Sequence, residues 1–393
     1  MINWKENFYK IIKGEKPEII PFIPRFDLWY KVNSNKEIKP EILTGINSQN
    51  DFYRKLGFIP YSNIPDFSAG GDLTRTIHRA LGFYNLPQIP FKINYNKTKV
   101  NYHFNNSTTF VEYITPVGSV DCEFVFTEEM KKSGATISWI NKRIIKSKDD
   151  YKILEYIFED MTIEDNYDEF NKFIKEQGGE YIPIATGLLA VSGMQHIMRD
   201  FLNVTEFFLH FVDYKNYLLN LAKKIDNKLS EIVNILTKCS AEIILIGANF
   251  DSTITFPPFY KSHILPQFQD ISKKLHKCAK KIISHCDGEN IDLWDLYLKS
   301  GIDILEAVAV KPMVKQSLEE ILDIMNNKAV IWGLINSISL LNSSLNEKDF
   351  RKYIDKLIAF SKDNKVILGI SDTAPIDMNI NRILYIRDMV LKP

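Results

Sequence analysis

The sequence has no excess of charge of either sign. It contains 49 Lys and Arg residues against 49 Asp and Glu residues, so its formal net charge is zero. A nucleic-acid surface needs a basic excess to bind phosphates, and electrostatic docking on anionic lipid needs one too. We therefore expect a small-molecule substrate, with no nucleic acid and no membrane among the partners.

The sequence also lacks the segments that direct a chain into or across a membrane. No uninterrupted apolar run approaches the roughly 20 residues of a membrane span, and the first six residues are mixed polar, unlike a signal peptide. Cysteine is scarce: the four residues are scattered without CxxC pairing, which does not suggest a disulfide framework in so long a chain. They are Cys122, Cys239, Cys278 and Cys286. We expect reduced thiols and a cytoplasmic protein.

Short apolar, β-rich runs alternate with amphipathic helical stretches, which is typical of βα units. Expected strands are 19–24, 181–186, 242–246, 281–284, 302–305, 329–332 and 366–368. Expected helices are 51–56, closed by Gly57, then 149–160, 167–177, 193–202, 204–237 with a break near Asp213, 259–280, 293–299, 317–325, 347–361 and 381–391. Seven or eight strands in this order predict a closed (β/α)8 TIM barrel, as a single domain over 1–393. An open doubly wound sheet is the alternative, but no Gly-rich dinucleotide fingerprint follows the first strand.

Residues 88–146 differ from this alternation. Four runs within them alternate or are rich in β-branched and aromatic residues: 91–95, 99–104, 108–113 and 121–127. Turn-forming residues separate them, namely Asn105-Asn106 and Pro116-Val117-Gly118. We expect an antiparallel β insertion between barrel units.

Polar and ionisable side chains gather where the expected strands end. They are Arg25 and Asp27 after the first strand, then Asn249, Asp251, His285, Asp287, Glu289, Glu306, Asn336 and Asp372. In a barrel these ends converge on one mouth, where the active site is built. The alternative is that charged residues bound strands because strands end at the surface. The opposite strand ends carry ordinary loop residues such as Lys365 and gather no histidine.

His285 is the first candidate for chemistry. It ends an apolar strand and precedes two carboxylates, Asp287 and Glu289, with Gly288 between them to allow a sharp turn. Such a histidine can bind Zn²⁺ or hold a proton near neutral pH, or it can be a hydrogen-bonded structural residue. Cys286 alternates to the other side of the strand and is expected to pack against the helices. The other histidines are expected to be structural, although His196 could border the pocket; they are His78, His103, His196, His210, His263 and His276.

Two further groups could contact a substrate. Arg25 would clamp a carboxylate or phosphate, unless it forms a salt bridge with Asp27. Aromatic residues near the mouth could stack on a planar substrate, although such residues more often belong to the core. They are Phe26, Trp29, Tyr30, Phe250 and Phe256.

These motifs together resemble the uroporphyrinogen decarboxylase superfamily, which includes cobalamin-dependent methyltransferases. The resemblance spans nearly the whole chain and is specific for the superfamily rather than for one activity. It implies a (β/α)8 barrel with its site at the carboxyl ends of the strands. The matching segments are 21–25, 113–118, 247–251, 285–290, 301–306, 332–333 and 372–375.

The sequence departs from both branches of that superfamily. The decarboxylase motif has two arginines four residues apart; Arg25 matches the first, but Trp29 stands at the second. The methyltransferase branch binds zinc through His-x-Cys and a later Cys. His285 matches the histidine, Asp287 stands at the first cysteine, and no cysteine occurs near 369–372. Any zinc ligands would come from His285, Asp287, Glu289, Glu306 and Asp251, with His285, Asp287 and Glu306 as the expected set. Such a site suits activation of an ether or alcohol oxygen.

The leading hypothesis is an enzyme that moves a methyl group between a small substrate and a corrinoid (cobalamin) on a partner protein. Catalysis would use His285, Asp287, Glu289 and Arg25. Substrate contacts would come from Asn249, Asp251, Asn336, Asp372, Trp29 and Phe250. The alternatives are a cofactor-independent decarboxylase, with a substrate held by Arg25, and a non-catalytic tetrapyrrole-binding protein.

Overall fold

The centre of the molecule is a six-stranded parallel sheet. The computed structural model describes residues 3–61 and 79–392. The strand order follows the chain from β7 to β12. The strands are β7 (Ile184–Leu188), β8 (Ile243–Ala248), β9 (Lys281–His285), β10 (Ile304–Val308), β11 (Val330–Asn336) and β12 (Val366–Ser371). All are almost entirely buried, as expected of parallel strands covered on both faces. The prediction of a mixed α/β fold is confirmed.

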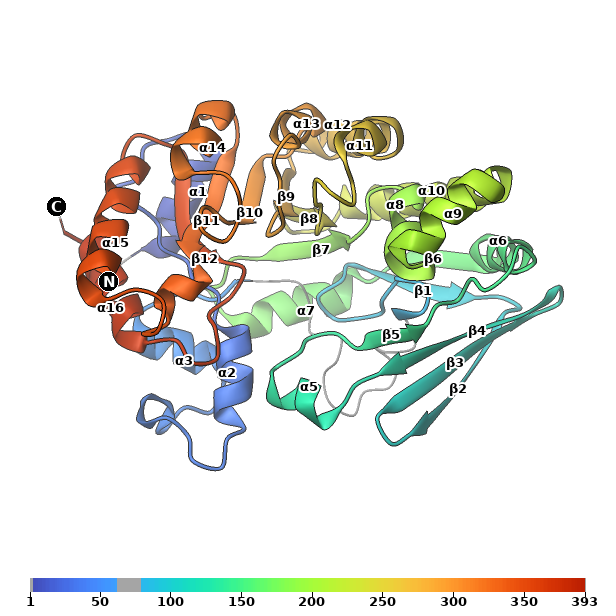
Figure 1. Ribbon diagram of the computed structural model, residues 1–393, viewed down its shortest axis with the longest axis horizontal. Helices are drawn as coiled ribbons and strands as arrows, with labels where there is room; N and C mark the ends of the chain where they lie inside the picture. The colour runs from blue at the N-terminus through green and yellow to red at the C-terminus, as the bar shows by residue number, and fades with distance from the viewer. Residues whose placement is uncertain (1–2, 62–78, 393) are drawn as a thin grey trace.

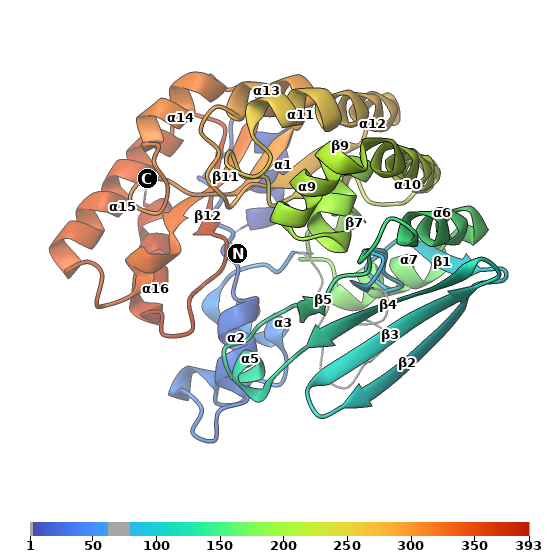
Figure 2. The same ribbon diagram turned by 45° about the vertical axis from the view of Figure 1, so that its right-hand side comes forward.

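Helices connect these strands and lie along the outer side of the curved sheet (Figures 1 and 2). After β7 they are α8 (Gly193–His196), the π-helical turn η2 (Ile197–Phe201), α9 (Val204–Asp213) and α10 (Lys215–Leu236). Then follow α11 (Pro257–His263), α12 (Leu265–Lys277), α13 (Trp294–Ser300), α14 (Leu318–Met325), η3 (Ser337–Leu340), α15 (Glu347–Ser361) and α16 (Ile380–Val390). Local signals set their ends: Ser317 and Glu320 form a capping box at α14, and Gly301 ends α13 in the left-handed conformation.

One expected helix, 259–280, is two helices in the structure. It divides at Ile264, between α11 and α12. Pro266 lies at the start of α12, and a proline has no backbone N–H and is best tolerated in the first turn of a helix. The expected break near Asp213 is confirmed, since α9 ends there.

The chain begins with short helices, of which the sequence predicts only α3, over 51–56 and closed by Gly57. They are α1 (Trp4–Lys13), α2 (Asp27–Ser34), η1 (Glu41–Leu43) and α3 (Gln49–Leu56). Between them, the segments at Phe22 and Tyr61 make one parallel bridge each, Phe22 to Leu368 of β12 and Tyr61 to Ile182 before β7. These segments extend the two edges of the central sheet.

A closed eight-stranded barrel, which the sequence predicts, is not found among the described residues. The edge segments make single bridges rather than full strands. Prolines explain this, because they cannot donate a backbone hydrogen bond to a ladder. Pro21 and Pro24 flank the first bridge, Pro60 precedes the second, and Pro183 follows its partner Ile182.

The expected antiparallel insertion is present and larger than predicted. A four-stranded antiparallel sheet contains β2 (Lys99–Asn105), β3 (Thr108–Thr115), β4 (Gly118–Val125) and β5 (Trp139–Lys142). A separate pair is formed by β1 (Phe91–Tyr95) and β6 (Met161–Asp165). The accompanying helices are α5 (Glu128–Lys132), α6 (Asp150–Asp160) and α7 (Tyr167–Gln177). Figure 2 shows the β2–β5 sheet apart from the central sheet.

In the part of the chain that the structure describes, no helix combines the length and the apolar character required to cross a bilayer. The four cysteines are free thiols, and only Cys278 is exposed.

Candidate functional site

The carboxyl ends of the central strands bring together side chains that lie far apart in the sequence. His285 is the last residue of β9, and the β9–β10 register places it beside Glu306. Asn249 follows β8 and Asp372 follows β12. Both adopt left-handed backbone conformations, with φ of 56° and 67°. Asn and Asp accept this conformation more readily than most residues, which suits them to these sharp strand ends.

Glu306 fixes the orientation of the His285 ring. Its Oε2 lies 2.5 Å from Nδ1 of His285, and both side chains are almost fully buried. Because a carboxylate only accepts hydrogen bonds, Nδ1 is the donor in this pair. Tyr61 donates its hydroxyl to the other oxygen of Glu306 at 3.3 Å. The Nε2 atom of His285 is therefore directed away from Glu306 and is available for another partner.

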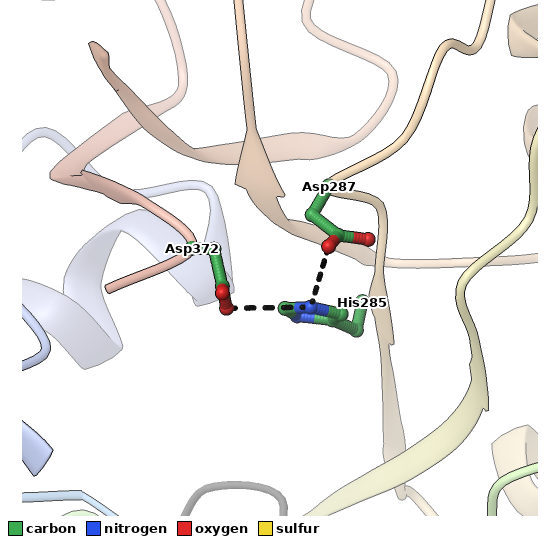
Figure 3. Close-up of side chains that lie close together, drawn as sticks. All are labelled: His285, Asp287 and Asp372. Atoms are coloured by element: carbon green, nitrogen blue, oxygen red, sulfur yellow. Dashed lines mark ion pairs between the residues drawn. The ribbon is translucent and has the colours of Figure 1, made fainter. Parts of the chain in front are cut away.

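Two carboxylates approach that second nitrogen. Oδ2 of Asp287 lies 3.6 Å from Nε2 of His285, and Oδ1 of Asp372 lies 3.5 Å from it. Figure 3 shows both carboxylates directed toward the same ring atom. One donor atom from each of the three residues lies within 4.8 Å of the others. We call His285, Asp287 and Asp372 the His285 cluster; its composition and spacing are suitable for a metal ion.

Arg25 supports the cluster from the first edge segment. Its Nη1 donates to Oδ1 of Asp372 at 2.6 Å, and its Nε and Nη2 donate to the two oxygens of Asp27 at 2.9 Å each. Thr373 also donates to Asp27, at 2.9 Å. All three nitrogens of the guanidinium are thus occupied by carboxylates, and Arg25 is only 7 % exposed. The salt-bridge alternative for Arg25 is what the structure shows.

The buried charges shift one another's pKa values. Burial opposes the charged form of His285, but the carboxylates of Glu306 and Asp287 outweigh it and hold the pKa of His285 well above its usual value. Burial likewise opposes ionisation of Asp287, yet contact with His285 lowers the pKa of that carboxyl. For Asp372 burial prevails over the opposing effects of Arg25 and His285, so its pKa is raised. The site thus attracts positive charge at His285.

The cluster opens into a pocket of about 320 Å³, which we call the His285 pocket. This volume falls at the lower end of the range typical of small-molecule sites. The lining residues are Arg25, Arg79, Tyr84, Thr136, Ile137, Leu189, Arg199, Asp200, Ala248, Asn249, His285, Asp287 and Asp372. Asn249 also donates to Asp287, at 3.3 Å. The pocket therefore has the polar cluster on one wall and arginines from other elements on another.

Three expected site residues bind the backbone of nearby loops instead of lining this pocket. Glu289 accepts a hydrogen bond from the backbone N–H of Lys315 at 2.8 Å. Asp251 accepts from the backbone N–H of Thr253 at 2.8 Å and from that of Glu289 at 3.3 Å. Asn336, which is 1 % exposed, accepts from the Val310 N–H and donates to the Lys311 carbonyl. These three side chains therefore stabilise the nearby loops.

Gly288 explains why Asp287 and Glu289 do not face the same way. A Cβ atom at position 288 would lie 2.7 Å from the carbonyl oxygen of Phe250, so only glycine allows the two loops to come this close. The chain then leads Asp287 into the pocket, while Glu289 turns to the neighbouring loop at Lys315. The expected inward placement of Glu289 is not observed.

Two of the aromatic candidates for stacking, Trp29 and Phe250, lie in the core. The Trp29 ring stacks on that of Phe52 at a centroid distance of 4.8 Å, and the Phe250 ring packs against Tyr260 at 5.3 Å. Both candidates are at most 3 % exposed. Neither can stack on a ligand in the pocket. Cys286 is also fully buried, as expected for a packed thiol.

The metal set expected from the sequence and the observed His285 cluster share His285 and Asp287 but differ in the third carboxylate. The expected metal set included Glu306, but Glu306 binds Nδ1 on the far side of the ring, and Asp372 approaches Nε2 in its place. The sequence does point to Asp372, because this residue ends the 369–372 segment, where the methyltransferase branch has its later cysteine ligand. The sequence gives no comparable indication that Arg79 and Arg199 belong to the site, since neither residue follows an expected strand. Of the other histidines, His78 lies outside the described residues.

The fold and the site together define an α/β protein with a histidine–carboxylate cluster at the carboxyl end of a parallel sheet. No family model and no curated protein matches the sequence. Among solved structures, the fold is similar to that of a methyltransferase from Methanosarcina mazei, with a TM-score of 0.51 and 12 % sequence identity. The match covers 99 % of this chain and 98 % of that one. At this identity, the likeness concerns the fold.

Proposed function

We propose that this chain is a cytoplasmic methyltransferase of the uroporphyrinogen decarboxylase superfamily. It would move a methyl group between a small substrate in the His285 pocket and a corrinoid on a partner protein. The observation that carries the proposal is the His285 cluster, held from behind by Glu306 and open to the pocket. The fold of a Methanosarcina mazei methyltransferase supports it. In this proposal the segments at Phe22 and Tyr61 are the remaining strands of a (β/α)8 barrel.

The residues of the cluster fit a zinc ion. Imidazole nitrogen and carboxylate oxygen are both ordinary zinc ligands, and three protein ligands are typical of catalytic zinc. The negative charge also fits. Asp27, Asp287, Glu306 and Asp372 face the single permanent positive charge of Arg25, so a divalent cation would offset much of the excess. His285, Asp287 and Asp372 would hold the ion.

Each supporting residue has a separate task in this arrangement. Glu306 accepts a hydrogen bond from Nδ1 of His285 and so would keep Nε2 unprotonated when a metal is bound, as carboxylates behind zinc-binding histidines do. Arg25 holds Asp372, and Asn249 holds Asp287. Bound zinc would supply Lewis-acid polarisation of a substrate ether or alcohol oxygen. Without zinc, the raised pKa of His285 keeps a proton on Nε2, which could be donated at the same place.

The decarboxylase alternative has less support. It needs Arg25 to hold a substrate carboxylate, and the guanidinium is already bound to Asp27 and Asp372. No observation favours the tetrapyrrole-binding alternative over it.

Metal analysis of the purified protein tests the zinc assignment. We expect about one zinc ion per chain, as at other catalytic sites, and its loss in His285→Ala and in Asp372→Asn. Glu289→Gln is the matched control, because this carboxylate lies near the cluster in sequence but binds a loop; it should retain zinc. A protein that is free of metal, and whose activity survives chelation, would remove zinc from the proposal.

Methyl transfer is tested separately with free cobalamin. Wild-type protein is incubated with cob(I)alamin and a panel of methyl ethers, methanol and methylamines, and methylcobalamin is followed by its absorbance spectrum. We expect methylcobalamin to form with at least one donor, and not with the His285→Ala variant. Absence of methylcobalamin with every donor would contradict the proposed reaction.

A further inference from the structure

The wall of the His285 pocket that Arg79, Arg199 and Asp200 line has no part in the mechanism above. Arg79 precedes the β insertion, and the other two belong to the π-helical turn η2. The pocket is therefore lined partly by residues at the ends of the central strands and partly by charged residues from other elements.

The two arginines are each held in place by neighbouring groups. Arg79 donates its Nε to the carbonyl of Ser138 at 3.1 Å. Arg199 donates its Nε and Nη2 to one oxygen of Asp200, at 2.9 and 2.7 Å. Asp200 is almost fully buried, whereas the Arg199 side chain is 24 % exposed. A side-chain hydrogen bond also joins Arg79 to Tyr84, which lines the same pocket. Within the described parts of the chain, Nη1 of Arg199 has no hydrogen-bond acceptor.

Among the described charges around this wall, arginines outnumber carboxylates. Arg143 lies behind it, donating to the backbone carbonyl of Arg199 at 2.6 Å. The charges that act on Arg143 are those of Asp200, Glu206, Arg79 and Arg199. Among these five groups of the described residues, arginines outnumber carboxylates by one. A ligand with one negative charge would complete the balance.

We propose that Arg79 and Arg199 bind the carboxylate end of a small monoanionic substrate whose other end reaches the His285 cluster. The planar fork of an arginine matches the two oxygens of a carboxylate, and such charge-assisted bonds are strong in a partly buried pocket. Arg25, the anion-binding residue expected from the sequence, is already bound to Asp27 and Asp372. The assignment rests on the proposed function only in treating this pocket as the substrate site.

Binding of two matched probes tests the carboxylate subsite. Sodium 3-methoxypropionate carries a carboxylate and a methyl ether, whereas 3-methoxypropionamide has the same shape without the charge. In ligand-observed NMR titrations without metal or corrinoid, we expect the carboxylate to bind about tenfold more tightly, as one charge-assisted contact provides. Equal binding of the two probes, or no binding of either, overturns the proposal.

Substitutions then locate the selectivity. Arg79→Met removes an arginine that is held by the Ser138 carbonyl and Tyr84, and it should abolish the preference for the carboxylate. Arg199→Lys keeps the charge beside buried Asp200 but loses the fork, and it should weaken carboxylate binding severalfold. Arg54→Met, on exposed helix α3, is the matched control and should bind like the wild type. Unchanged selectivity in Arg79→Met contradicts the assignment.

A third probe, methyl phosphate, tests the charge of the ligand. The surplus of one positive charge predicts weaker binding of this dianion than of the carboxylate. Tighter binding of methyl phosphate would overturn the assignment to a monoanion.

The outcomes separate this inference from the proposed function. Carboxylate selectivity without any methylcobalamin formation would leave the subsite standing and refute methyl transfer. Methylcobalamin formation from a neutral donor, with no carboxylate selectivity, would support methyl transfer and refute the carboxylate subsite.

Discussion

At the scale of single residues, the two nitrogens of His285 have different partners and therefore different tasks. Nδ1 is held by Glu306, and Nε2 faces Asp287 and Asp372. The identity of His285 could be predicted because it ends an apolar strand beside acidic residues. The division of carboxylates between its two sides could not, since it depends on which strands are neighbours and how far each side chain extends.

This division predicts the effect of changing Glu306. Glu306→Gln would leave a neutral amide beside Nδ1, removing the charge that makes His285 a strong ligand, and zinc affinity should fall by about 10- to 100-fold. Competition titration with a chelating dye measures the change. Tyr61→Phe, which removes only the longer 3.3 Å bond to Glu306, is the milder comparison. Equal zinc affinity in Glu306→Gln and the wild type would argue against a supporting role for this carboxylate.

His196 predicts a pH dependence of stability. It is 2 % exposed, and burial lowers its pKa to about 4. A histidine with a lowered pKa in the folded state stabilises the protein above its unfolded pKa, near 6.5, and this contribution is lost as the pH falls toward 4. The loss should reach about 3 kcal/mol in the free energy of unfolding.

Urea unfolding at a series of pH values measures this contribution. His196→Gln can still donate to the Leu81 carbonyl but does not titrate, so it should remove this part of the acid sensitivity. His103→Gln, on exposed strand β2, should leave the sensitivity unchanged. The assignment to His196 fails if both variants lose stability in acid as the wild type does.

At the scale of elements, helix α8 and the turn η2 position part of the pocket. Gly193 begins α8 and packs directly on α10, where a Cβ atom would lie 2.1 Å from the carbonyl oxygen of Ala222. The next turn, η2, carries Arg199 and Asp200 to the pocket. The close contact between two helices therefore sets where these two charges lie.

Gly193→Ala should consequently affect both stability and binding. The added methyl group forces α8 away from α10, which should cost about 1–3 kcal/mol in the free energy of unfolding, and should weaken binding of 3-methoxypropionate. Gly179→Ala is the matched control, because a Cβ atom there has no neighbour within 4 Å. Urea unfolding and the NMR titration measure the two effects. Full stability in Gly193→Ala would show that the helices adjust freely.

The elements differ in how well the sequence predicts them. The amphipathic helix expected at 167–177 has the same bounds as α7. The spacing of its apolar residues indicates a helix, and Gly178 indicates where the helix ends. The strands β5 and β6 were not predicted. β5 is short and mostly exposed, and β6 ends in Glu164 and Asp165, so neither has the apolar pattern of a buried strand. Their pairing with distant strands is a tertiary effect that local patterns do not contain.

At the scale of the whole molecule, the N-terminal segment completes a site made by the C-terminal half. Phe22 is bridged to Leu368 of β12, and this contact places Arg25 beside Asp372. The sequence predicted that these ends meet, because parallel strands share one edge. It did not predict how little pairing the first segment makes, since the limit comes from the positions of Pro21 and Pro24.

Phe22→Ala tests this long-range connection. The fully buried ring packs edge-on against Phe58 at a centroid distance of 5.2 Å, and its removal should cost about 3–5 kcal/mol in the free energy of unfolding. Phe104→Ala, whose ring is 55 % exposed on β2, should change stability by no more than about 0.5 kcal/mol. Urea unfolding distinguishes them. Similar small changes in both would mean that the N-terminal segment is not anchored by this ring.

The prolines beside the two bridges have a consequence for neighbouring copies of the molecule. An unprotected sheet border offers N–H and C=O groups on which another chain can align and begin to aggregate. Here each border of the central sheet is covered by a short segment in which Pro21, Pro24 or Pro60 interrupts the series of donors. A strand of another molecule would find few backbone N–H donors at these edges. The prolines that limit pairing within the sheet therefore also discourage self-association at its edges.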